Sequence, residues 1–214
     1  MTIVVKYTVV SSTFHILKTL KELMEFPILS FDIETKGVYS KEERKIASKL
    51  LETDISSEAR KMASLVANNS GLSFPSLVNV THFVFGVSES ESVIIVTETM
   101  IDEMRVWRWL VNYRGLLLIH NTLFDLKVMY HRTQSYPQFY EDTQLMAKAL
   151  INNCDAWKAK VGLKELMGSH YDPKWTLIDE YEPEDLRKES FLRYASIDGA
   201  ATFKLYVLLQ EDYC

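Results

Sequence analysis

Two acidic residues within a short apolar segment are the first feature of this sequence that could do chemistry. Asp32 and Glu34 stand two positions apart in residues 28–34, ILSFDIE, a run whose apolar, β-type composition predicts a buried core strand. Because side chains alternate along a strand, both carboxylates leave the same face of the sheet. Buried carboxylates are unfavourable unless they are paired or bind a cation. The pair therefore predicts either a salt bridge or a metal site.

Two further pairs of polar residues have helical spacing. Asn121 and Asp125 are four apart at the start of a predicted helix that follows a strand, near the edge where open α/β sheets place their sites. Tyr194 and Asp198 are also four apart, among mostly apolar neighbours, so Asp198 is expected to face the interior. Each acid has an ordinary alternative, because Asp125 could simply favour the helix dipole and Asp198 could be exposed on an amphipathic helix. The argument lies in the combination of carboxylates.

Three segments, in order, resemble the exonuclease motifs of the DEDD superfamily. They read SFDIETKG, IHNTLFDLKVMYH and YASIDGAATFKLY, and the Tyr-x-x-x-Asp of the third resembles the tyrosine branch rather than the histidine branch. The intermediate EDTQLMAKAL and GLKELMG are similar to connecting segments in the proofreading domains of family A DNA polymerases and in ribonuclease D relatives. The resemblance runs from about Val9 to Leu209, without residues 39–70.

The resemblance implies a ribonuclease-H-like fold and two divalent metal ions, Mg²⁺ or Mn²⁺. It implies that Asp32 bridges both ions and that Glu34 and Asp198 hold the first. Asp125 would support the second ion, largely through water, and Tyr194 would orient the attacking water. Hydrolysis of a phosphodiester needs a hydroxide, charge stabilisation and help for the leaving oxygen, and two hard cations about 4 Å apart supply all three. Oxygen ligands suit these cations.

Three residues near the motifs are candidates for substrate binding. Asn121 matches a motif position near the substrate end, Lys36 could meet a phosphate, and Phe124 could stack on a terminal base. The alternatives are an exposed lysine and a core phenylalanine.

A later stretch interleaves an aromatic residue with cations, as single-strand binders often do. Its members are Trp157, Lys158, Lys160 and Lys164. We interpret this stretch as a solvated loop followed by a helix start.

The elements that must position these residues alternate between strands and helices, which predicts an α/β domain with a mixed central sheet flanked by helices. We expect a single domain over residues 1–214, with an inserted helical arm at 39–70 whose apolar residues have roughly helical spacing. The expected strands cover residues 3–10, 28–34, 80–88, 91–97, 116–120 and 139–142. The expected helices cover residues 11–26, 100–113, 121–131, 143–151, 162–168 and 183–210.

Composition limits the compartment and the partners. The formal net charge of −5 argues against tight non-specific binding of duplex nucleic acid. An enzyme could still bind the end of a nucleic-acid strand through metal ions. Cys154 and Cys214 make no disulfide framework, so an intracellular, cytoplasmic protein is expected, of cellular or viral origin. No apolar run approaches the ~20 residues that span a bilayer, so no membrane partner is expected.

These observations leave three functions open. The first is a stand-alone 3′-5′ exonuclease that releases nucleoside monophosphates from single-stranded DNA, with a separate polymerase as a candidate partner. The second is a ribonuclease D-like or short-oligonucleotide exoribonuclease, for which the same acids would serve. The third, from another class, is an inactive module that binds nucleic acid or a protein partner, and the intact acids and Tyr194 count against it.

Overall fold

The structure is a computed structural model that describes residues 4–36, 39, 41–68, 78–151, 161–171 and 188–213. Six strands form one sheet: β1 (Lys6–Val10), β2 (Ile28–Lys36), β3 (Asn79–Gly86), β4 (Glu91–Val96), β5 (Leu116–Ile119) and β6 (Tyr140–Asp142). The helices are α1 (Thr13–Leu23), α2 (Lys41–Leu51), α3 (Ser57–Asn68), α4 (Met100–Asn112), α5 (Leu123–Thr133), α6 (Thr143–Ile151), α7 (Leu163–Glu165), which continues into the π-helical turn η1 (Leu166–Tyr171), and α8 (Glu189–Tyr213).

The sheet is mixed, as the sequence predicts. Its strand order is β1-β4-β3-β2-β5-β6. The pairs β2–β3 and β3–β4 are antiparallel. The pairs β1–β4, β2–β5 and β5–β6 are parallel. The hairpin expected between residues 80 and 97 is thus confirmed, and β2 lies in the middle of the sheet.

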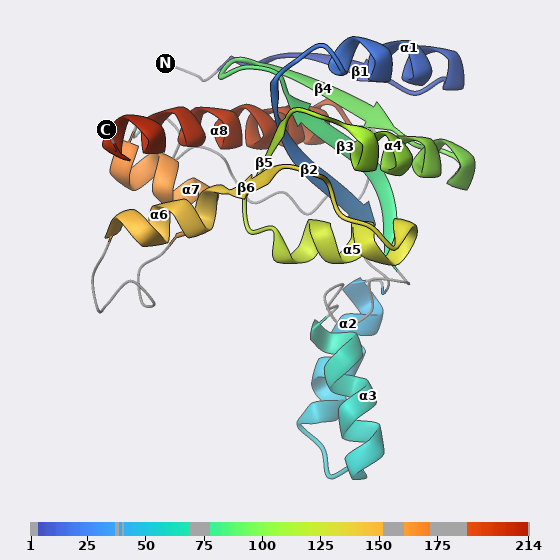
Figure 1. Cartoon of the computed structure of the whole chain (residues 1–214). Coiled ribbons are helices and arrows are strands. Elements are labelled where there is room, and N and C mark those ends of the chain that lie inside the picture. The colour runs from blue at the N-terminus through green and yellow to red at the C-terminus, as the bar shows by residue number, and fades with distance from the viewer. Residues whose placement is uncertain are drawn as a thin grey trace.

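Helices cover both faces of the sheet (Figure 1). The main hydrophobic core gathers residues of α1, α4 and α5 against one face, whereas α8 packs across β2, β3 and β4 on the other. Expected and observed helix bounds agree closely for α1, α4 and α6. The start of the closing helix, residues 183–187, lies outside the described residues, and in the described part no helix is long and apolar enough to cross a membrane.

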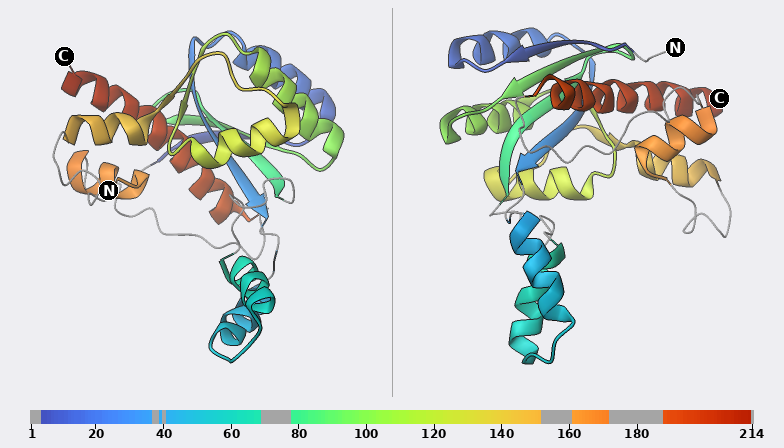
Figure 2. Two further views of the ribbon diagram at one scale, coloured as in Figure 1. Left: turned by 60° about the horizontal axis from the view of Figure 1, so that its bottom comes forward. Right: turned by 180° about the vertical axis from the view of Figure 1, so that it is seen from behind.

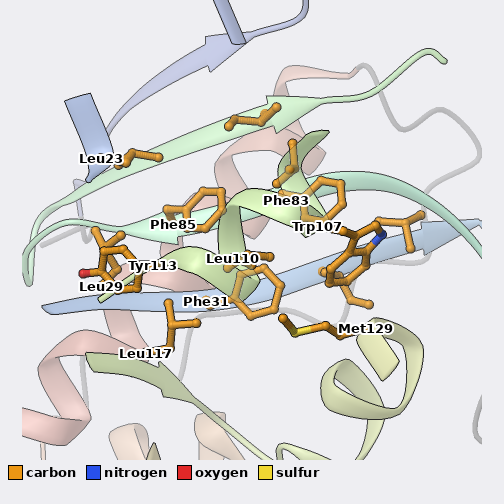
Figure 3. Packing of buried hydrophobic residues seen from close by; sticks show 14 of the residues in the cluster. Leu23, Leu29, Phe31, Phe83, Phe85, Trp107, Leu110, Tyr113, Leu117 and Met129 are labelled. Carbon is orange, nitrogen blue, oxygen red and sulfur yellow. The ribbon is translucent and has the colours of Figure 1, made fainter. Parts of the chain in front are cut away.

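An aromatic cluster anchors the first face (Figure 3). Phe31 of β2 and Phe83 of β3 are almost fully buried, and the ring centroids of Phe83 and Trp107 lie 4.8 Å apart in an edge-to-face arrangement. Such pairs add about 0.5–1.5 kcal/mol beyond the area that they bury. Because Phe31 and Ile33 point into this core, the alternating side chains Asp32 and Glu34 leave the opposite face of β2, toward α8.

The second face holds α8 by a close contact between backbones. The Ser30 hydroxyl donates to the Gly199 carbonyl at 2.6 Å, and the Ser92 hydroxyl donates to the Ser196 carbonyl at 2.8 Å. A Cβ added at Gly86 would lie 2.5 Å from the Gly199 carbonyl oxygen. Glycine at this point of β3 therefore lets α8 approach the sheet more closely than any side chain would allow.

The arm predicted at residues 39–70 is a pair of helices that contact each other and project away from the sheet (Figures 1 and 2). Its small residues Ala47 and Ala63 are buried. The larger apolar residues Ile46, Leu50 and Met62 are exposed. Two helices alone offer too narrow an interface to cover every apolar side chain.

We predict that Gly86→Ala destabilises the protein by about 1–3 kcal/mol, because the added methyl group meets backbone that cannot move independently of α8. Urea unfolding measures this change. Gly162→Ala is the matched control, since the Cβ there meets only the end of the flexible Glu165 side chain, so its effect should be small. Equal stability of the two variants would contradict the importance of this contact.

Candidate functional site

The first pair of acids lies at the middle of the sheet, on the face that α8 covers. Asp32 pairs in register with Val84, and Glu34 with His82, both on β3. Both acids are partly buried, and the register shifts between Glu34 and Thr35. The predicted spacing therefore places both carboxylates on one face, next to a β-bulge, a feature often found beside active sites.

Asp125 reaches the same strand from the first turn of α5. Its side chain is 3% exposed, and its Oδ1 accepts a hydrogen bond from the Ile33 backbone N–H at 3.2 Å. The pairing of β2 with β5 ends at Ser30 and Leu118, so Asp125 satisfies a donor beyond the end of β5. A helix-dipole role alone does not account for this buried contact.

The third part of the site comes from α8. Tyr194 and Asp198 are partly buried, and the tyrosine hydroxyl donates a hydrogen bond to the Asp198 carboxylate. The other carboxylate oxygen, Oδ1, is buried and has no hydrogen-bond partner among the residues that the structure describes. An acceptor left in this state is costly unless a donor or a cation reaches it.

The carboxylates of these three elements act on one another electrostatically. Burial, and after it the charge of Asp198, raises the pKa of Asp32 to about 7. Burial and then the charges of Asp32 and Asp198 raise the pKa of Glu34 to about 9. The pKa of Asp125 is also raised, by burial and by Asp32, and burial raises that of Asp198 to about 6. The site is therefore a cluster of acids whose negative charges disfavour one another.

One cation lies beside this cluster. The Lys164 ammonium sits over the Tyr194 ring, 4.7 Å from its centroid, and its charge lowers the pKa values of Glu34 and Asp198. The side chain is partly buried, and Lys164 lies in the short helix α7, in line with the predicted helix start. The other members of that stretch, Trp157, Lys158 and Lys160, lie outside the described residues.

The three candidate substrate residues have different surroundings. Lys36 is exposed at the end of β2, and Phe124 is partly buried against the main core, in line with its alternative as a core residue. Asn121 is exposed but does not belong to the helix, which begins at Leu123 and not at residue 121 as expected. Hydrogen bonds from its backbone and that of Thr122 to Asp142 form a turn there instead. The sequence analysis did not select Asp142.

The donor set suits a hard divalent cation in its chemistry. The acids offer only oxygen ligands, they repel one another, and Asp198 Oδ1 is buried without a partner in the described part of the chain. Within that same part, no three His, Cys, Asp or Glu side chains already form an arrangement that could hold a metal ion.

Comparison with solved structures shows which fold this is. Brucella melitensis NrnC matches with a TM-score of 0.60 and 15% identity, covering 98% of this chain and 81% of that one. Escherichia coli RNase D, described as an exoribonuclease involved in structured RNA processing, matches with a TM-score of 0.56 and 14% identity. The match covers 97% of this chain and 45% of RNase D. The Aedes aegypti Nibbler EXO domain matches with a TM-score of 0.55 and 15% identity, covering 96% of this chain and 88% of the domain.

These similarities confirm the predicted ribonuclease-H-like fold. No protein-family model and no curated protein matches the chain. NrnC has also been solved with bound Mg²⁺ and bound to pGG. The resemblance to family A polymerase proofreading domains, and to the tyrosine branch in particular, stays a prediction.

We predict that Asp198→Asn stabilises the metal-free protein near pH 8. Burial raises the pKa of Asp198 from 3.8 to about 6, so between these values the folded chain holds a proton that the unfolded chain has released. The free energy of unfolding therefore falls as pH rises through this window, and the whole decrease is present at pH values above it. Removing the charge should raise the free energy of unfolding by about 2 kcal/mol near pH 8 and by much less near pH 4.

Urea unfolding in EDTA at both pH values measures this difference. Asp102→Asn is a control of opposite sign, because the hydrogen bond from Thr99 lowers the pKa of Asp102 and its charge is stabilising. An Asp198→Asn variant less stable than the parent near pH 8 would contradict the electrostatic description of the site.

Proposed function

We propose that this chain is a metal-dependent 3′-5′ exonuclease. The observation that carries the proposal is the convergence of mutually destabilising carboxylates from β2, α5 and α8, within a fold shared with RNase D. A salt-bridged structural cluster would have matched each acid with a cation. The Lys164 ammonium only partly offsets the negative charge of the acids, since the pKa of Glu34 stays near 9.

The proposed cofactors are two divalent ions, Mg²⁺ or Mn²⁺, held by Asp32, Glu34, Asp125 and Asp198. When bound, such ions supply a hydroxide near neutral pH and stabilise the charge on the phosphoryl and leaving oxygens. The Mg²⁺ in the NrnC structure supports this assignment. Protons held by the raised-pKa carboxylates would leave as the cations bind, so metal affinity should rise with pH.

Tyr194 is proposed to position the attacking water. Burial raises the pKa of its hydroxyl, which therefore keeps its proton and acts as a hydrogen-bond donor or, through its lone pairs, as an acceptor. Two residues contact its ring: the Lys164 ammonium lies over it, and the Phe191 ring stacks with it at a centroid distance of 6.4 Å. A fixed hydroxyl beside Asp198 can orient a water at the carboxylates, which is the positioning part of catalysis.

The substrate is proposed to be a nucleic acid with a free 3′ end. The sequence analysis favoured single-stranded DNA, whereas the pGG ligand of NrnC and the RNA processing of RNase D favour the ribonucleotide alternative. A contact to the 2′-hydroxyl would decide between the polymers. A single domain over residues 1–214 and a separate polymerase as partner are further parts of the proposal.

Digestion of 5′-labelled single-stranded DNA and RNA of one sequence, with Mg²⁺, Mn²⁺ or EDTA, tests the proposal. We expect a ladder that shortens from the 3′ end, requires metal, and slows at least ~100-fold in Asp32→Asn. Asp102→Asn is the matched control, since it removes a buried carboxylate of α4 and should keep the activity. The DNA-to-RNA rate ratio selects the polymer.

The inactive-module alternative predicts a different result. Failure of the wild-type chain to degrade either polymer, including short oligonucleotides, would overturn the exonuclease proposal. The exposed apolar residues of the α2–α3 arm would then be the surface to examine.

A further inference from the structure

The turn between β5 and α5 has an unusual backbone. Asn121 has a φ of 63°, in the left-handed region, and in the described chain only Gln134 shares this feature among non-glycine residues. Gln134 ends α5, where such a conformation is common, but Asn121 precedes the helix. A non-glycine residue in this region costs on the order of 1 kcal/mol and persists where surrounding contacts impose it.

One carboxylate imposes this conformation. Asp142 ends β6, directly beside Ile119 at the end of β5 in the parallel register. Its Oδ1 accepts from the backbone N–H groups of Asn121 at 3.2 Å, Gln144 at 2.8 Å and Leu145 at 3.2 Å. Its Oδ2 accepts from the Thr122 backbone N–H at 2.9 Å and from the Thr122 hydroxyl at 2.8 Å.

The charge of this carboxylate is maintained. Burial acts to raise the pKa of Asp142, but the hydrogen bonds from Thr122 and its neighbours outweigh it and leave that pKa below its ordinary value. Thr122 is the N-cap residue of α5, yet its side chain makes no capping hydrogen bond to the helix and serves Asp142 instead. The turn is thus organised around Asp142, at the expense of the usual helix cap.

The turn fixed in this way presents two exposed side chains within four residues of Asp125, one of the acids of the site. Asn121 is exposed, and Leu123 is 63% exposed although it is apolar. Four residues after Asn121, Asp125 is buried, and its carboxylate accepts a hydrogen bond from the Ile33 backbone N–H. The same short segment therefore joins an outward-facing amide and leucine to a carboxylate of the site.

We propose that Asp142 is a positioning residue that presets the Asn121–Leu123 turn to receive the 3′-terminal nucleotide of the substrate. This inference rests on the proposed exonuclease function. The Asn121 amide can donate to and accept from a sugar hydroxyl or phosphate, and Leu123 offers an apolar surface to the sugar or base. Because the turn is held before the substrate arrives, binding does not have to order it.

Steady-state kinetics on the polymer that the wild-type chain degrades faster test this role. Asp142→Asn should raise KM about tenfold and change kcat much less, since the turn contacts the nucleotide and not the reacting atoms. Asp102→Asn is the matched control, because the Asp102 carboxylate likewise accepts hydrogen bonds at a helix N-terminus, here from the hydroxyls of Thr99 and Thr13. A merely structural role would lower the melting temperature in both variants and leave KM unchanged in both.

A milder pair of variants covers the case in which Asp142→Asn fails to fold. Thr122→Val removes a single hydrogen bond to Asp142 and leaves the donors of Gln144 and Leu145 in place. Thr122→Ser keeps the hydroxyl. We expect KM to rise several-fold in Thr122→Val and to stay near the wild-type value in Thr122→Ser, and equal KM values in the two would overturn the proposal.

Equilibrium binding separates this inference from the proposed function. The probe is a short 5′-fluorescent single-stranded oligonucleotide, of DNA and of RNA, measured by anisotropy with Ca²⁺ in place of Mg²⁺. A wild-type chain that neither binds nor degrades the probe overturns the exonuclease function and this inference with it. A wild-type chain that binds, with Asp142→Asn and Asp102→Asn binding equally well, overturns the inference alone.

Discussion

The close approach of α8 to the sheet is the constraint on which the candidate site depends. Gly86 and Gly199 remove the side chains that would hold the two elements apart, and the hydroxyls of Ser30 and Ser92 bond to backbone carbonyls of the helix. Those carbonyls belong to a helix interior and already accept intrahelical bonds, so the serines add a second donor. The contact fixes the height of Asp198 above β2, and with it the spacing of acids from distant parts of the chain.

The site that this contact creates works against the stability of the fold. Carboxylates from three elements share a partly buried space, and burial is the first cause of each raised pKa. The packing that stabilises the fold lies on the other face of the sheet, where Phe31, Phe83 and Trp107 contact one another. A single strand, β2, thus carries core residues on one side and charges on the other, so the core holds the acids in position.

The sequence predicted the features that depend on residues close together in the chain. The alternation in residues 28–34 was enough to place Asp32 and Glu34 on one face, and the order of strands and helices was enough for a mixed sheet. The helix start at Leu123 was not predictable in this way, because a carboxylate about twenty residues later, Asp142, draws the preceding backbone into a turn. Likewise, the position of Lys164 over Tyr194 depends on the packing of α7 against α8. The exposure of Ile46 and Met62 reflects a helix pair with few neighbours, which periodicity does not reveal.

The arm also bears on how this chain could diversify. It leaves from the end of β2 and returns at the start of β3, and those strands are antiparallel neighbours whose pairing extends to Lys36 and Asn79. In topology the arm is therefore an enlarged hairpin loop, closed at its base by the strands themselves. Its length and surface can change through insertion or deletion while the strand register below stays the same. Evolution could thus alter what the protein contacts at this end independently of how β2 places Asp32 and Glu34.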